Sequence, residues 1–230
     1  MVYLVLPIPA KSNMPTNPIQ YIVKKIDAVP APPANIMATP LPRLELEHRK
    51  LDYFLGTAGG CLSYGQLIEW GIPWGCHGRM VIIRSILAEA TRRHQWCLWV
   101  HDQEQLDIYP PAWQASGVDL RYLRVAACPE ATTNSPMIEL KAVFMSSFFK
   151  VIVVDCHLSA QDYMFLARRA RQSGLLILVL RKHFLTPRLG NVWAKSRLNC
   201  WTEASRELFY LRMIKGPNQD NNPVCFSWSD

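Results

Sequence analysis

The sequence predicts an α/β fold: a mainly parallel central sheet between two layers of helices, with an antiparallel edge. From residue 46 onward, short and almost wholly apolar runs alternate with amphipathic segments of helical length. This alternation is typical of strands that are buried on both faces. The last three runs have no helix between them, and residues 215–223 are rich in turn formers. We therefore expect an antiparallel meander to close one edge.

The expected strands follow the apolar runs in order along the chain. In the first part they are 65–71, 96–100, 122–127, 151–155 and 175–180, and in the final third 196–201, 208–213 and 224–228. The run 151–155 is a continuous apolar strand that ends in an acid, Asp155.

Three helices are expected between these strands. Segment 81–94 carries its apolar residues on one face and ends in Arg92, Arg93 and His94, cations that suit a helix C-terminus. Apolar residues also recur near helical spacing within 137–149. A third helix over 159–172 begins at Ser159, a favourable N-cap, with an acid three residues later.

The first 42 residues contain nine of the seventeen prolines. Proline at this density blocks regular helices and central strands. We therefore expect residues 1–45 to form a proline-rich flexible arm and residues 46–230 to form the folded domain.

Composition narrows the functional classes. The chain has 230 residues, a net charge of +7 and a basic surplus in residues 1–50 and 151–230, which suits an acidic or nucleic-acid partner. There is no apolar run of about 18 residues and no secretory leader pattern, so no membrane span is expected. Seven scattered cysteines without metal-site spacing indicate free thiols in the cytoplasm and predict no metal site.

The stretch 67–79, LIEWGIPWGCHGR, stands where a strand leads into a helix. A phosphate-binding P-loop has this position and the pattern G-x-x-x-x-G-K-[ST]. Its best register here is 73–80: Gly78 remains, but Pro73, Arg79 and Met80 replace the first glycine, the lysine and the hydroxyl residue. Gly75 lies within this register and is a further candidate remnant. Arginine's planar fork does not fit the compact lysine slot, and methionine offers magnesium no oxygen. We expect a degenerate nucleotide site, no cofactor and no enzymatic activity.

Two further fragments follow in the order used by RecA-type NTPases. Segment 99–123 resembles a RecA-superfamily pattern through nine matching residues: Asp102, Glu104, Leu106, Asp107, Tyr109, Gly117, Val118, Asp119 and Leu123. The strand 151–155 resembles a Walker B strand. In an active relative Glu104 would activate water and Asp155 would sit beside magnesium. Because the loop lacks the residues that bind phosphate, we interpret Glu104 and Asp155 as remnants.

Within that superfamily the chain resembles the ImuA family, RecA- and SulA-related accessory proteins of bacterial translesion mutagenesis cassettes. The resemblance covers roughly residues 46–215 and includes Leu51-Asp52, Gly59-Gly60 and the G-x-L-x-E signature in 65–71. It implies a three-layer RecA-like core. It also implies a damage-inducible role beside an ImuB-like inactive Y-family polymerase homologue, with RecA and a specialised replicative-type polymerase as further expected partners.

The chain departs from RecA where RecA binds DNA. The loop after 151–155 leads almost directly into a helix, and the loop 181–195 is short, although basic. Filament assembly on single strands is therefore not expected. A smaller basic surface could still touch phosphates weakly, and its candidate residues are Arg181, Lys182, Arg188, Lys195 and Arg197.

Two groups of residues are candidates for protein contacts. Arg168, Arg169 and Arg171 cluster on one expected helix, where they form either a solvated face or a docking surface. Among the tryptophans, Trp96 and Trp99 are expected in a core strand, and Trp70, Trp74 and Trp113 at an interface. The function predicted is a non-catalytic scaffold in damage-induced mutagenesis. A DNA-dependent RecA-type ATPase and a SulA-like division inhibitor remain as alternatives.

Overall fold

The computed structural model describes residues 44–46, 48–56, 62–73, 79–101, 109–128, 140–188, 191–203, 208–216 and 222–227. The segment predicted as an arm falls outside these ranges except for its last two residues. Leu44 is already fully buried, and its N–H donates to the carbonyl oxygen of Leu62 over 3.1 Å. The packed domain therefore includes residue 44.

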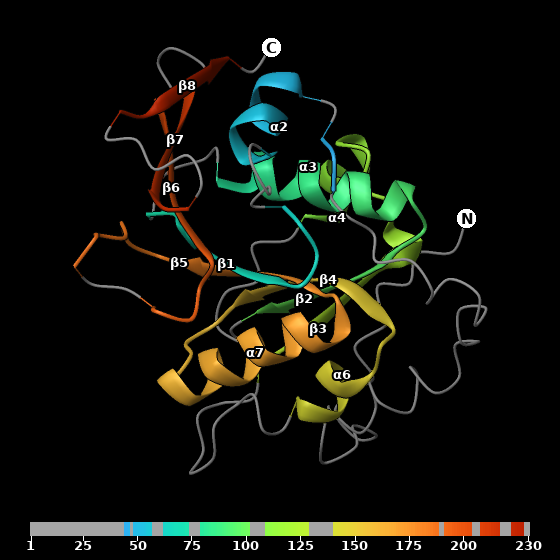
Figure 1. The fold of residues 1–230 in the computed structure, drawn as a ribbon. Helices are drawn as coiled ribbons and strands as arrows, with labels where there is room; N and C mark the ends of the chain where they lie inside the picture. Colours follow the sequence, from blue (N-terminus) through green and yellow to red (C-terminus); the bar gives the residue numbers. More distant parts are fainter. Residues whose placement is uncertain are drawn as a thin grey trace, which may run out of the picture.

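Eight strands form one sheet in the order β3-β2-β4-β5-β1-β6-β7-β8 (Figure 1). The strands are β1 (Gln66–Gly71), β2 (Trp96–His101), β3 (Leu123–Ala127), β4 (Phe149–Asp155), β5 (Leu176–Arg181), β6 (Ser196–Glu203), β7 (Leu208–Lys215) and β8 (Val224–Ser227). The first six pair in parallel, whereas β7 and β8 run antiparallel at one edge. The predicted parallel sheet with an antiparallel edge is confirmed.

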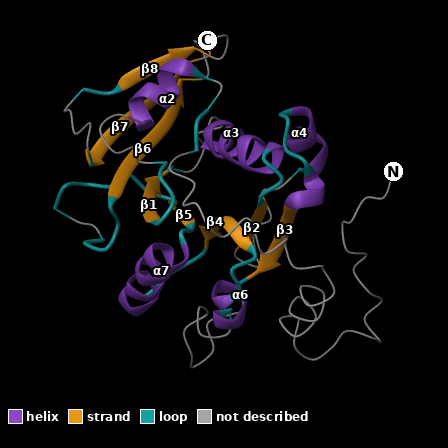
Figure 2. Cartoon of the chain, turned by 45° about the vertical axis from the view of Figure 1, so that its right-hand side comes forward, coloured by secondary structure: helices purple, strands orange, loops and turns teal. Residues whose placement is uncertain are grey.

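Helices cover both faces of the sheet (Figure 2). One layer contains α2 (Arg49–Gly56), α3 (Arg79–Arg92) and α4 (Pro110–Ala115), with the 3-10 turn η2 (Leu120–Tyr122). The other layer contains α6 (Lys141–Met145) and α7 (Ala160–Ser173). None of the helices in the described ranges is long and apolar enough to cross a membrane.

Alternate residues of the buried strands face opposite layers. On β4, Val151 and Val153 pack into the core under α3, whereas Ile152 and Val154 pack into the core under α7. Both cores bury side chains nearly completely. Strands that are apolar on both faces therefore occupy the centre of the sheet, as their sequence predicts.

The second predicted helix is wrong in extent. The spacing indicated a helix over 137–149, but α6 ends at Met145 and Phe149 opens β4. Phe149 pairs with Trp96 on β2 and is fully buried. Sheet pairing therefore outweighed the apolar spacing. Residues 137–139 lie outside the described ranges.

The predictions for the tryptophans are confirmed in one case and wrong in two. Trp99 lies in the core, as expected. Trp70 and Trp113, predicted at an interface, are 0% and 2% exposed, so this prediction is wrong for both. Trp113 packs edge-on against Trp99, with ring centroids 5.1 Å apart. Trp74 lies outside the described residues.

The start of α7 follows its sequence signal. The Ser159 side chain accepts from the N–H of Asp162, and the Asp162 carboxylate accepts from the N–H and hydroxyl of Ser159. This reciprocal capping satisfies backbone donors that a helix start otherwise leaves unpaired. At the other end, Gly174 adopts a left-handed conformation with φ of 59°.

Candidate functional site

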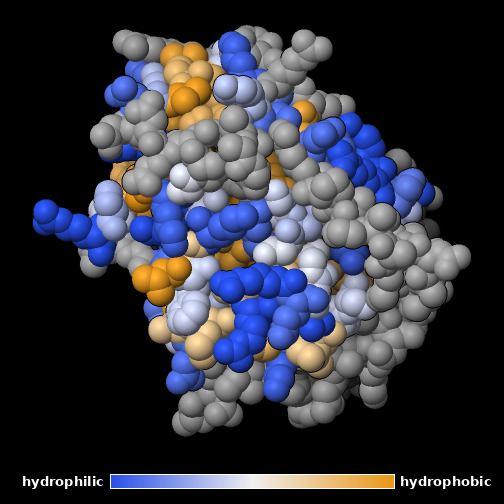
Figure 3. Space-filling view, viewed as in Figure 1, coloured by the Kyte–Doolittle hydropathy of each residue, from blue (hydrophilic) through white to orange (hydrophobic). Residues whose placement is uncertain are grey.

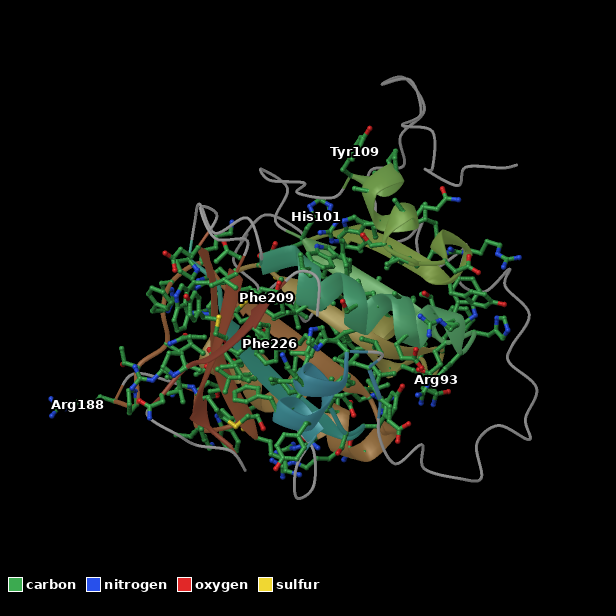
Figure 4. All side chains as sticks on the ribbon, turned by 90° about the horizontal axis from the view of Figure 1, so that it is seen from above. Arg93, His101, Tyr109, Arg188, Phe209 and Phe226 are labelled. Carbon is green, nitrogen blue, oxygen red and sulfur yellow. The ribbon has the colours of Figure 1, made fainter. Side chains whose placement is uncertain are left out.

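The carboxyl ends of the parallel strands meet at one edge of the sheet, where ligands bind in open α/β folds. Gly71 ends β1 opposite Arg181 at the end of β5. His101 ends β2 opposite Asp155 at the end of β4. Figure 4 shows His101 with Tyr109 farther out on the same side of the molecule. Of the predicted nucleotide-site remnants, Asp155 lies at this edge.

The structure places only part of these remnants. Gly75, Gly78 and Glu104 lie outside the described residues. The backbone of Arg79 and Met80 forms the first turn of α3, so these residues stand at the helix start that follows β1. Asp155 ends β4 and is 7% exposed. Its position agrees with a Walker B-like aspartate, and its role as a remnant stays a prediction.

A buried ionic cluster lies beside this edge, on the α7 face of the sheet. Glu69 on β1 is 3% exposed and accepts a hydrogen bond from Nε of Arg197 on β6 over 2.9 Å. Its other carboxylate oxygen accepts from the Tyr163 hydroxyl over 2.9 Å and lies 3.8 Å from Nε of Arg181. Burial, reinforced by the negative charge of Glu69, raises the pKa of Tyr163. Two cations and a hydroxyl thus satisfy one carboxylate that would otherwise be costly to bury.

The same cluster holds the loop that follows β5. Nη1 of Arg197 donates to the Thr186 carbonyl over 3.0 Å. Asn199 accepts from the Leu185 N–H over 2.7 Å and donates to the Leu185 carbonyl over 2.9 Å. Farther along, the Lys195 N–H donates to the Leu67 carbonyl over 2.9 Å. The described parts of this loop are therefore fastened to the sheet.

Gly71 makes this close approach possible. A Cβ at this position would collide with Oδ1 of Asn199 and lie 2.9 Å from the His183 carbonyl oxygen. Any larger residue would push the loop off the end of β1. The sequence marks Gly71 only as the end of an apolar run, so its structural role was not predicted.

These contacts show that only some of the five residues predicted to form a basic surface are exposed. Arg197 is 4% exposed and paired with Glu69, so it is not part of the surface. Arg181 also lies against Glu69 and retains 23% exposure of its side chain. Lys182 is half-buried, whereas Arg188 and Lys195 are exposed. Figure 4 shows Arg188 projecting away from the body of the molecule. Whether these residues contact DNA stays a prediction.

The three arginines of α7 do not share one face. Nε and Nη2 of Arg169 donate to the carbonyl oxygens of Phe144 and Met145 on α6, over 2.8 and 2.7 Å. Arg168 and Arg171 are exposed and line a groove on the other side of the helix. The predicted cluster therefore separates into one arginine that joins two helices and two that face solvent.

A buried carboxylate was the signal that could have revealed the cluster. Glu69 lies within a strand whose other residues are also buried, and a buried charge requires a partner. The sequence could not identify that partner, because Arg197 is 128 residues away along the chain. Among the described residues, no three His, Cys, Asp or Glu side chains are grouped so that they could hold a metal ion.

The comparisons with known proteins show the fold. No family model matches the chain, and no curated protein matches its sequence. Among solved structures, the crystal structure of the RadB recombinase is similar, with a TM-score of 0.61. That match covers 77% of this chain and 92% of the RadB chain at 14% identity. The predicted RecA-like architecture is therefore confirmed.

Proposed function

We propose that this chain is a non-catalytic RecA-like accessory protein that acts through protein contacts in DNA-damage-induced translesion synthesis. One observation carries the proposal: α3 begins with Arg79 and Met80, at the point where a working P-loop supplies lysine and a hydroxyl. Neither residue type provides the compact ammonium or the magnesium ligand that phosphoryl transfer needs.

The loop after β5 supports the same proposal. It is short and is fastened to the sheet through Asn199 and Arg197, which limits its freedom to wrap a DNA strand. A scaffold needs a rigid surface, whereas a filament-forming recombinase needs nucleotide and DNA loops that respond to each other. The fastened loop therefore favours assembly by contact.

The expected partner is an ImuB-like inactive Y-family polymerase homologue, with RecA and a specialised replicative-type polymerase as further members. This part rests on the resemblance to the ImuA family over residues 46–215. The chain would hold these proteins together near damaged DNA, with weak DNA contact of its own.

Two measurements on the full chain test the proposal. We expect no magnesium-dependent ATP hydrolysis, with or without single-stranded DNA, where an active RecA protein serves as the positive control. We also expect the ImuB-like homologue to co-purify with the chain in the absence of nucleotide. ATP turnover that disappears in Glu104→Gln would show a working RecA-type ATPase instead. Cell filamentation on overexpression, without co-purification, would favour a SulA-like inhibitor.

A further inference from the structure

A groove runs along the outer side of α7. Its volume is about 280 Å³, and its lining residues are Met164, Ala167, Arg168, Arg171, Gln172 and Trp193. The five helical residues recur at steps of three and four, so they form one stripe about two turns, or roughly 11 Å, long. The opposite wall is Trp193, from the loop that leads into β6.

The wall is held in place by the sheet. Nζ of Lys215 on β7 donates to the carbonyl oxygens of Val192 and Ala194, on either side of Trp193, over 3.1 and 2.7 Å. The N–H of Trp193 donates to Oδ1 of Asn191 over 2.9 Å. Trp193 is nevertheless 41% exposed, and Val192 is 77% exposed. The backbone around Trp193 is thus held to the sheet while two apolar side chains stay exposed, which is the usual character of a contact site.

The floor and the rim of the groove differ in chemistry. Ala167 is 3% exposed, and its small side chain creates a hollow between the larger Met164 and Trp193. Arg168 and Arg171 stand at the rim, and neither side chain has an ion pair or hydrogen bond with any described residue. Figure 3 shows hydrophilic surface over α7 with an apolar spot beside it.

Among the residues that the structure describes, none compensates the charge on this side of α7. The only acid of the helix is Asp162, which is 3% exposed and occupied in capping the helix start. An anionic partner could therefore form ion pairs with Arg168 and Arg171 without displacing an existing ion pair. The arm of this chain is a poor occupant, because residues 1–43 contain four basic residues and one acidic residue.

We propose that this groove binds an acidic amphipathic segment of a partner protein. An apolar side chain of that segment fills the hollow over Ala167 against Trp193, and its carboxylates pair with Arg168 and Arg171. The inference rests on the proposed scaffold function, because it supplies the surface through which the chain holds a partner. Arg169 is not part of this surface.

The direct test uses two synthetic amphipathic peptides with free ends blocked. One carries a leucine pair with a glutamate on either side, and the other has lysines in place of the glutamates. The full chain is labelled with 5-fluorotryptophan, and its Trp193 fluorine resonance is assigned through Trp193→Phe. We expect the glutamate peptide to shift that resonance saturably, and the lysine peptide to leave it unchanged.

Charge reversal makes the test specific. In Arg168→Glu with Arg171→Glu, the glutamate peptide should bind at least about tenfold more weakly, and the lysine peptide should now bind. Arg188→Glu changes an exposed arginine outside the groove and should leave peptide binding unaffected. Equal circular dichroism spectra and melting temperatures of the variants would show that all of them fold.

Three results would overturn the inference. The first is an unchanged Trp193 resonance with the glutamate peptide. The second is an equal shift by a peptide with serines in place of the leucines, which would remove the apolar anchor. The third is a shift by an oligothymidine that charge reversal abolishes, which would make the groove a nucleic-acid site.

Failure of the inference and failure of the proposed function are distinguishable. If the ImuB-like homologue co-purifies equally with wild type, the charge-reversed variant and Trp193→Ala, the scaffold function stands and the groove is not its docking site. If the homologue fails to co-purify with wild type, the scaffold function fails whether or not the peptide binds.

Discussion

Glu69 on β1 and Arg197 on β6 form a buried ion pair across two neighbouring parallel strands. Nε of Arg197 lies 2.9 Å from the Glu69 carboxylate, and each side chain is 4% exposed. Arg197 also donates to the Thr186 carbonyl, so this pair connects the first strand of the domain to the loop after β5. The position of that loop therefore depends on a buried charge near the carboxyl edge of the sheet.

Glu69→Gln should destabilise the domain strongly. The substitution leaves the Arg197 guanidinium buried without a counter-charge, a change that costs about 3–5 kcal/mol of unfolding free energy. Urea denaturation measures the loss. Glu69→Met combined with Arg197→Met should recover most of it, because neither charge then remains buried. Arg121→Ala, which breaks an exposed pair with Asp119, is the matched control and should leave stability nearly unchanged. Equal effects of Glu69→Gln and Arg121→Ala would show that the buried pair does not hold the domain together.

Arg169→Ala should loosen α6, whereas Arg168→Ala should not. Arg169 donates to two carbonyl oxygens in the last turn of α6, and a cation there also suits the helix dipole. Losing these bonds should cost about 1 kcal/mol and speed hydrogen exchange of the α6 amides. Arg168, one residue earlier on the same helix, has no such contact and is the matched control. Equal exchange in the two variants would contradict the distinction between them.

The strands could be predicted from the sequence because a strand that is buried on both faces appears as a continuous apolar run. Runs such as 151–154 and 175–180 are apolar throughout, and no other local arrangement explains them as well. The error at α6 arose because Leu140, Phe144 and Phe148 match helical spacing, while the pairing of Phe149 with Trp96 is not visible locally.

The site was harder to predict because its contacts connect distant residues. The sequence marks Arg197 as a cation near a basic loop, but only the structure shows that its strand directs it toward Glu69. In the same way, three arginines within four positions of α7 look alike in the sequence. Their separation follows from the helical turn, which carries Arg169 to α6 and the other two to the groove.

Alkaline solution should destabilise the domain through Tyr64. The Tyr64 hydroxyl donates to Gln95, and burial raises the pKa of Tyr64 to about 12 from its ordinary value near 10. Between these values the unfolded chain has lost the proton and the folded chain retains it. Stability should therefore fall as pH rises through this window, by about 1.4 kcal/mol per pH unit from this group.

The measurement is urea unfolding at several pH values from 9 to 12. Tyr64→Phe should show a shallower decline than wild type, because it has no proton to lose. Tyr53→Phe, at a tyrosine that is 73% exposed, is the control and should follow the wild-type profile. Parallel profiles for wild type and Tyr64→Phe would contradict the raised pKa.

Arg188 and Lys195 should carry the weak DNA contact expected of this chain. Both are exposed, neither has an ion pair or hydrogen bond through its side chain with a described residue, and Arg197 is buried against Glu69. Fluorescence anisotropy with a labelled oligothymidine should show binding that weakens steeply with salt. Arg188→Gln and Lys195→Gln should each weaken binding and reduce the salt slope by about one. Arg168→Gln, on the groove side of α7, is the control and should leave both quantities unchanged. If Arg188→Gln and Lys195→Gln leave DNA binding unchanged and Arg168→Gln weakens it, the nucleic-acid contact lies on α7. In that case the assignment of the groove to a protein partner fails.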